Sequence, residues 1–300
     1  MSETEKNGRE GNASDHPPDV RTAADAAPAE RLSGENGAAA ASAEHPSGES
    51  DGAAASEENR FGERHVSAAP EEPDVLAGGY RSAAASEVGI PRKDLLWYLG
   101  CRGQDPGPEV NRKIDKVCRE LEEHAAPALF YLRFPLTADS DGYPVIAGVP
   151  VRSGNLRKNL TGCESVLLCA ATLGTETDRL LYRYAQTDLS GQTILQAASA
   201  ALLEAFLDQE QDRIRREAAG QGLYLRPRFS PGYGDFPLES QLWIFDLLKP
   251  GRRLGITLTS SLLMIPSKSV TAVAGLGRKD IGCRKNGCEA CTLTSCAFRR

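Results

Sequence analysis

The chain of 300 residues has a formal net charge of −6, and its charge is unevenly distributed. Residues 1–86 contain 17 acidic and 7 basic side chains, whereas residues 87–300 contain 24 and 28, so the two parts carry −10 and +4. The first part is rich in Ala, Gly, Ser, Glu and Pro, and this composition cannot bury enough apolar surface to offset the entropy lost on ordering. We therefore predict a disordered acidic tail over residues 1–86, followed by one large folded domain.

The composition also excludes several classes of protein. Only His124 of the four histidines lies outside the predicted tail, so a Ser-His-Asp triad, a His-rich zinc site or a two-metal hydrolase would lack bases or ligands. No run of 18 apolar residues occurs, and no apolar segment follows Met1. We expect neither a membrane span nor a secretory signal, and hence a cytoplasmic protein.

Apolar periodicity predicts two helices and two strands in the first half of the folded part. Pro91 begins a helix that ends before Gly100, and residues 109–124 carry apolar side chains at spacings of three and four, as in an amphipathic helix. Residues 128–135 and 143–149 alternate loosely and contain β-branched and aromatic residues, which predicts strands.

The second half begins with an apolar run at residues 165–172, followed by Gly174 and then Thr175, which predicts a strand, a glycine turn and a helix. The remaining predicted elements are a long helix at 193–220, a helix at 238–248 that Pro250 and Gly251 end, and strands at 253–259 and 270–276. Helices and strands mix without a sustained βαβ rhythm. We therefore predict an α+β fold with a largely antiparallel sheet.

Two features of this half suggest a ligand site. Glu204 lies among Ala and Leu in the long helix, so it is either buried, and then needs a partner or ligand, or at the edge of the apolar stripe. Residues 228–237 have two Pro and two Gly in ten positions and cannot form a regular element. There Arg228 offers a planar fork for a carboxylate, Gly232 allows close backbone approach and Tyr233 presents a flat face. A ligand such as S-adenosylmethionine would suit these groups.

Three sequence blocks resemble a known family. The sequence Arg-Phe-Ser-Pro-Gly-Tyr at 228–233 resembles the Arg-x-x-x-Gly-Tyr motif of the reactivation (activation) domain of cobalamin-dependent methionine synthase, including Pro231. Leu-Leu-Glu-Ala-Phe at 202–206 resembles the preceding helix of that family, where a glutamate also lies. Residues 258–270 resemble its later Leu-Thr-Glu-Ser and Met-x-Pro-x-x-Ser-Val stretch. The three blocks occur in the family's order, which makes the resemblance specific.

The resemblance implies a C-shaped α+β domain at residues 87–274, built around a bent antiparallel sheet. It implies that S-adenosylmethionine is held by Glu204, Arg228, Pro231, Gly232 and Tyr233. Such a domain supports reductive methylation of cob(II)alamin, with an electron from a flavodoxin-like reductant. Because the folded part has no room for homocysteine, folate or cobalamin modules, we expect it to act on a separate methionine synthase that lacks its own activation domain. It would then be a component of a methyltransferase reaction in methionine biosynthesis.

The chain departs from the family at three places. Ser260 stands where the family has the glutamate after Leu-Thr. Asp94 is only a loose counterpart of an aspartate near the start of the family's domain. The tyrosine-containing segment near the family's C-terminus is replaced by residues 275–300. Part of the S-adenosylmethionine pocket must therefore differ.

The replacing segment contains a dense set of thiols, which are Cys283, Cys288, Cys291 and Cys296. Four thiolates can hold one zinc ion or an iron–sulfur cluster. The first three follow the plant-type ferredoxin spacing, while zinc sites more often contain two Cys-x-x-Cys pairs. We predict a four-cysteine metal knuckle with either metal, and disulfides or free thiols as the alternative. Basic residues around it could steer an acidic partner such as a flavodoxin.

Two other functions fit parts of the sequence. The same groove could serve a different corrinoid methyltransferase. The four-cysteine segment with its basic flanks could instead form a nucleic-acid-binding or interaction module. The charge of only +4 in the folded part argues against nucleic acid as the partner.

Overall fold

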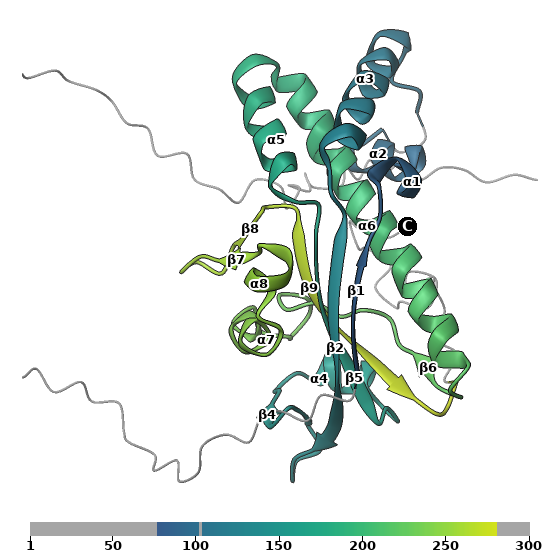
Figure 1. Ribbon diagram of the computed structural model, residues 1–300, viewed down its shortest axis with the longest axis vertical. Helices are drawn as coiled ribbons and strands as arrows, with labels where there is room; N and C mark the ends of the chain where they lie inside the picture. Colours follow the sequence, from purple (N-terminus) through teal and green to yellow (C-terminus); the bar gives the residue numbers. More distant parts are fainter. Residues whose placement is uncertain (1–76, 102–103, 281–300) are drawn as a thin grey trace, which may run out of the picture. The chain divides into compact units, whose positions relative to one another are not determined.

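A computed structural model describes residues 77–280, with the exception of residues 102 and 103 (Figure 1). The helices are α1 (Ala85–Val88), α2 (Arg92–Tyr98), α3 (Pro108–His124), α4 (Gly154–Asn159), α5 (Thr175–Thr187), α6 (Leu189–Ala219), α7 (Ser240–Leu248) and α8 (Pro250–Leu254). The strands are β1 (Ala77–Ser82), β2 (Ala128–Ala138), β3 (Pro144–Ile146), β4 (Val149–Pro150), β5 (Ser165–Thr172), β6 (Tyr224–Leu225), β7 (Thr257–Leu258), β8 (Met264–Ile265) and β9 (Ser269–Gly277). The predicted α+β class is confirmed.

The main sheet is antiparallel and has β5 near its centre. The strand order is β4-β3-β2-β5-β9-β6, with β1 paired to β2 as well. β5 pairs with β2 on one side and with β9 on the other, over eight residues each. All residues of β5 are buried. Its continuous apolar run fits this position, because a strand covered on both faces has no solvent-facing positions to fill with polar residues.

Alternate residues of the strands enter two separate cores, as the two-residue repeat of a strand requires. Leu167 and Cys169 of β5 pack in the core that α1, α2, α3, α5 and α6 cover. Val166 and Leu168 pack in the core that α4 and α7 cover. The sheet is thus a middle layer, with α6 on one side and α7 and α8 on the other (Figure 1).

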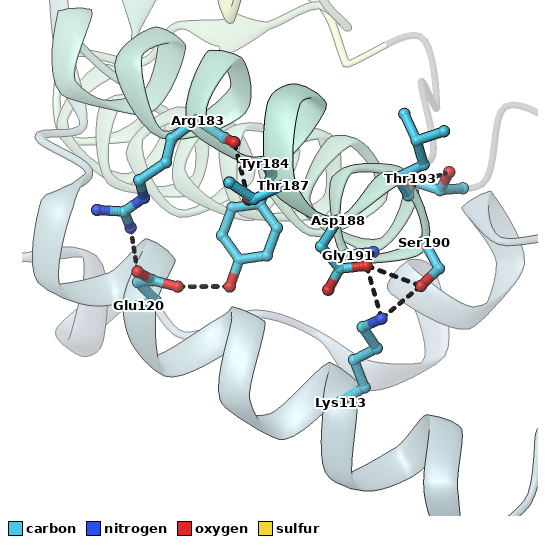
Figure 2. Close-up of polar contacts among 10 residues, drawn as sticks. Lys113, Glu120, Arg183, Tyr184, Thr187, Asp188, Ser190, Gly191 and Thr193 are labelled. Carbon is cyan, nitrogen blue, oxygen red and sulfur yellow. Dashed lines mark hydrogen bonds and ion pairs between the residues drawn. The ribbon is translucent and has the colours of Figure 1, made fainter.

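Polar contacts join α3 and α5 to the start of α6, as Figure 2 shows. Asp188 is the N-cap of α6, because its carboxylate accepts a hydrogen bond from the Gly191 N–H at 3.0 Å. Lys113 of α3 donates to the same carboxylate oxygen at 2.7 Å. Along α5, Arg183 and Tyr184 both bond to Glu120 of α3. The beginning of the helix that carries Glu204 is therefore tied to α3 by Lys113, and α3 is tied to α5 by Glu120.

Ordered structure begins earlier than the predicted end of the tail at residue 86. β1 pairs with β2 in a register that runs from Ala77 opposite Arg133 to Ser82 opposite Ala128. The sequence Ala-Gly-Gly-Tyr-Arg-Ser has little apolar surface, so composition alone missed it. Its order comes from main-chain hydrogen bonds and from close packing, since a Cβ at Gly79 would lie 2.5 Å from the Tyr131 hydroxyl oxygen.

Two other predicted boundaries need correction. Pro250 does not only end α7: it occupies the first turn of α8, where its missing N–H costs no hydrogen bond. α8 therefore takes the place of the first residues of the strand predicted at 253–259. β9 continues to Gly277 because Tyr224 of β6 pairs with that residue, so the sheet crosses the predicted domain boundary at residue 274.

No helix within the described residues is long and apolar enough to cross a membrane.

Candidate functional site

The loop predicted to bind a ligand lies along β9. Phe229 exchanges two main-chain hydrogen bonds with Val273, at 2.8 and 2.9 Å. This bridge fixes the direction of the neighbouring side chains, because successive residues of an extended chain face opposite sides. Phe229 packs on the core under α7 and stacks on Phe236 at 6.1 Å. Arg228 therefore faces α6 on the other side of the sheet.

The Arg228 guanidinium is held by three side chains of α6. Its Nη2 lies 3.2 Å from Glu204 Oε2 and 3.0 Å from Asp208 Oδ1, and its Nη1 donates to Gln211 Oε1 at 2.9 Å. Residues 204, 208 and 211 are spaced by four and three positions, so they share one face of the helix. The Arg228 side chain is only 18% exposed. The structure thus brings together two of the predicted site residues and adds Asp208 and Gln211.

Glu204 is at the edge of the apolar stripe and is not buried. Its side chain is 44% exposed, and that of Asp208 is 54% exposed. Behind Arg228, between α6 and the sheet, lies a cavity of about 20 Å³ that Tyr131, Cys169 and other mostly apolar residues line. It has room for about one water molecule. A ligand of the size of a nucleoside therefore does not fit in this cavity.

The turn at Gly232 and Tyr233 follows Arg228 in the same loop. The Gly232 N–H donates to Phe236 O at 2.8 Å, and Gly232 has a φ of 89°, a backbone conformation that favours glycine. Pro231 is buried beneath the turn. The Tyr233 side chain is 69% exposed. Its ring is therefore free of the core and open to a contact from solvent.

Asp235 fastens this turn to α4, which the sequence analysis did not foresee. Its carboxylate accepts hydrogen bonds from Ser153 Oγ at 2.5 Å, from the Gly154 N–H at 2.6 Å and from the Asn155 N–H at 3.0 Å. These bonds, that of Ser153 most, lower the pKa of Asp235. The sequence indicates this contact only weakly, because it shows no more than an aspartate in one loop and a helix-capping serine 82 positions away.

The third sequence block joins α5 to β9. Ser267 donates its N–H and its hydroxyl to the Asp178 carboxylate, at 2.7 and 2.6 Å. Ser269 Oγ donates to Thr172 Oγ1 at 2.9 Å. Ser260 lies in the turn between β7 and β8, and Asp94 lies on α2. The block therefore supports the fold around the site.

The four cysteines of the predicted metal knuckle lie outside the described residues. Between residues 77 and 280, leaving aside 102 and 103, no group of three or more His, Cys, Asp or Glu side chains could hold a metal. Burial raises the pKa of Cys118 and of Cys169 to about 11. Both are therefore thiols at neutral pH, as expected of packing residues.

Residues 158–278 match the family model described as "Vitamin B12 dependent methionine synthase, activation domain". The predicted family resemblance is confirmed. The matched activation-domain region contains Glu204, Asp208, Arg228 and Tyr233, together with the strands β5 and β9 that position them.

A solved structure agrees with this match. The chain is similar to the crystal structure of the MetH reactivation domain bound to AdoHcy, with a TM-score of 0.50 and 18% sequence identity. The similarity covers 70% of this chain and 82% of that one. At this identity it shows a shared fold.

Proposed function

We propose that this chain binds S-adenosylmethionine at Glu204, Arg228 and the Gly232–Tyr233 turn, and that it supports reductive methylation of cob(II)alamin on a separate methionine synthase. The observation that carries the proposal is the contact between Glu204 and Arg228, at 3.2 Å, inside the activation-domain region. The bound AdoHcy of the similar structure, which is the demethylated product, supports the same ligand class.

Each group at the site has a chemical task that fits this ligand. The partly exposed carboxylates of Glu204 and Asp208 can accept hydrogen bonds from an ammonium group. Arg228 already donates to three side chains of α6, so a ligand carboxylate would share its donors or replace one of these contacts. The exposed Tyr233 ring offers an apolar face for an adenine base.

The role of the chain in the reaction would be to bind and orient the methyl donor. S-adenosylmethionine supplies the methyl group, and cobalamin held by the partner receives it once a flavodoxin-like protein has supplied one electron. The partner would be a cytoplasmic cobalamin-dependent methionine synthase without its own activation domain. We predict that an iron–sulfur cluster or a zinc ion would be held by Cys283, Cys288, Cys291 and Cys296.

Calorimetry on the full chain tests the ligand, and a reconstitution tests the role. We expect S-adenosylmethionine to bind at micromolar affinity with no cobalamin present. We also expect the chain to restore activity to an inactivated methionine synthase lacking an activation domain, given S-adenosylmethionine and reduced flavodoxin. No binding of S-adenosylmethionine or its demethylated product at millimolar concentrations would reject the proposal. Binding without reactivation would reject methionine synthase as the partner and favour a different corrinoid methyltransferase.

A further inference from the structure

Asp208 places a second carboxylate on the guanidinium that the ligand site uses. Its Oδ1 lies 3.0 Å from Arg228 Nη2, slightly closer than Glu204 Oε2 at 3.2 Å to the same nitrogen. Both carboxylates come from α6, one helical turn apart. Both carboxylates form ion pairs with Arg228.

This arrangement leaves the site with an excess of negative charge. Glu204 and Asp208 carry two negative charges and Arg228 carries one positive charge, so the three groups sum to −1. Gln211, which takes the other end of the guanidinium, is neutral and does not change this sum. The two carboxylate side chains are about half exposed, so a ligand can reach them from solvent.

We propose that Asp208 is a specificity-determining residue that makes the site prefer the cationic methyl donor to its neutral product. This inference rests on the proposed function. S-adenosylmethionine carries a sulfonium, an ammonium and a carboxylate, so its net charge is +1. Loss of the methyl group turns the sulfonium into a neutral thioether, and the net charge falls to zero. A site with an unbalanced carboxylate attracts the first and releases the second more readily.

The size of the effect follows from Coulomb's law. One unit charge acting on another at roughly 6 Å changes a binding constant by about threefold in bulk water, and by more in the lower effective dielectric of a half-exposed site. This is enough to bias a site toward fresh methyl donor when donor and product are present together.

Asp208→Asn separates charge from position. The amide keeps an oxygen at the place of Oδ1, so Arg228 keeps its hydrogen-bond acceptor while the negative charge is lost. Asp212→Asn is the matched control, because Asp212 lies one turn further along α6 and pairs with Arg215.

The test is calorimetry on the full chain with S-adenosylmethionine and S-adenosylhomocysteine. We expect the ratio of their dissociation constants to change by about threefold or more in Asp208→Asn, with weaker binding of the donor, and to keep its wild-type value in Asp212→Asn. An unchanged ratio in Asp208→Asn, with a wild type that binds both ligands, overturns the inference alone. A wild type that binds neither ligand rejects the proposed function and the inference with it.

A second measurement needs no variant. If charge sets the preference, raising the salt concentration from about 0.05 M to about 0.5 M should weaken the wild-type preference for S-adenosylmethionine over S-adenosylhomocysteine, because salt screens exposed charges. A ratio that does not respond to salt would count against Asp208 as its source.

Discussion

Glu204 and Arg228 are 24 positions apart in the sequence, and the 3.2 Å contact between Glu204 Oε2 and Arg228 Nη2 joins α6 to the loop that follows β6. The contact depends on two separate supports. The bridge between Phe229 and Val273 orients the loop, and the contacts of Asp188 with Lys113 and Gly191 fix the start of the helix.

Replacing Arg228 tests the centre of this site. We expect Arg228→Ala to weaken S-adenosylmethionine binding by about 2–4 kcal/mol, because the ligand carboxylate is left without its charged partner. Arg228→Lys should recover only part of the loss, since a lysine keeps the charge but not the planar fork. Calorimetry measures both affinities, and thermal melting controls for folding. If both variants bind like the wild type, Arg228 has a structural role only.

The pKa of Asp188 tests the polar contacts of Figure 2. The hydrogen bond from Lys113, followed by that from the Gly191 N–H, lowers this pKa to about 2. A carboxyl group with a lower pKa in the folded state stabilises the fold above its unfolded pKa, and the stabilisation is lost as the pH falls through the folded value. Lys113→Ala should therefore raise the Asp188 pKa in an NMR titration and lower the melting temperature at neutral pH.

The matched control for this titration is Arg112→Ala. It removes a cation from the same helix, whereas the shift of Asp188 comes chiefly from the hydrogen bonds of Lys113 and the Gly191 N–H. If both variants move the Asp188 pKa equally, the general charge of α3 and not the Lys113 bond is responsible.

Two truncations test where the folded part begins. Removing residues 1–76 should leave the melting temperature and ligand binding unchanged, because the acidic composition offers no core. Removing residues 1–86 also deletes β1 and takes Arg81 away from Glu210, whose side chain is 4% exposed. Because six residues of β1 pair with β2, the longer truncation should melt at a clearly lower temperature. Equal melting temperatures would show that β1 contributes nothing.

Metal analysis tests the four-cysteine prediction. Chain purified without air or chelators should carry about one metal centre, the usual stoichiometry for four thiolate ligands. An iron–sulfur cluster would give visible absorption that bleaches on reduction, whereas zinc would leave the protein colourless. A serine variant of Cys288 should lose the metal, and one of Cys118, on α3, should retain it. Protein with neither metal would leave thiol chemistry as the explanation for these cysteines.

Local sequence patterns determined much of this fold. The apolar run at residues 165–172 became β5 with the predicted bounds, and residues 109–124 became nearly all of α3. The Pro and Gly content of residues 228–237 correctly predicted an irregular loop. Such features depend on interactions between residues a few positions apart, so the sequence displays them directly. The family motif likewise identified Glu204 and Arg228 as candidates.

Only the tertiary structure decided which partners these residues have. In the sequence, Asp208 is one of many charged residues on a long helix. In the structure, the bridge of Phe229 to Val273 orients Arg228 so that it contacts Asp208. β1 has no apolar pattern of its own, and its order depends on main-chain bonds to β2, some fifty positions away. Contacts of this kind form when distant segments pack on a shared sheet. The short-range spacing of residues therefore does not predict them.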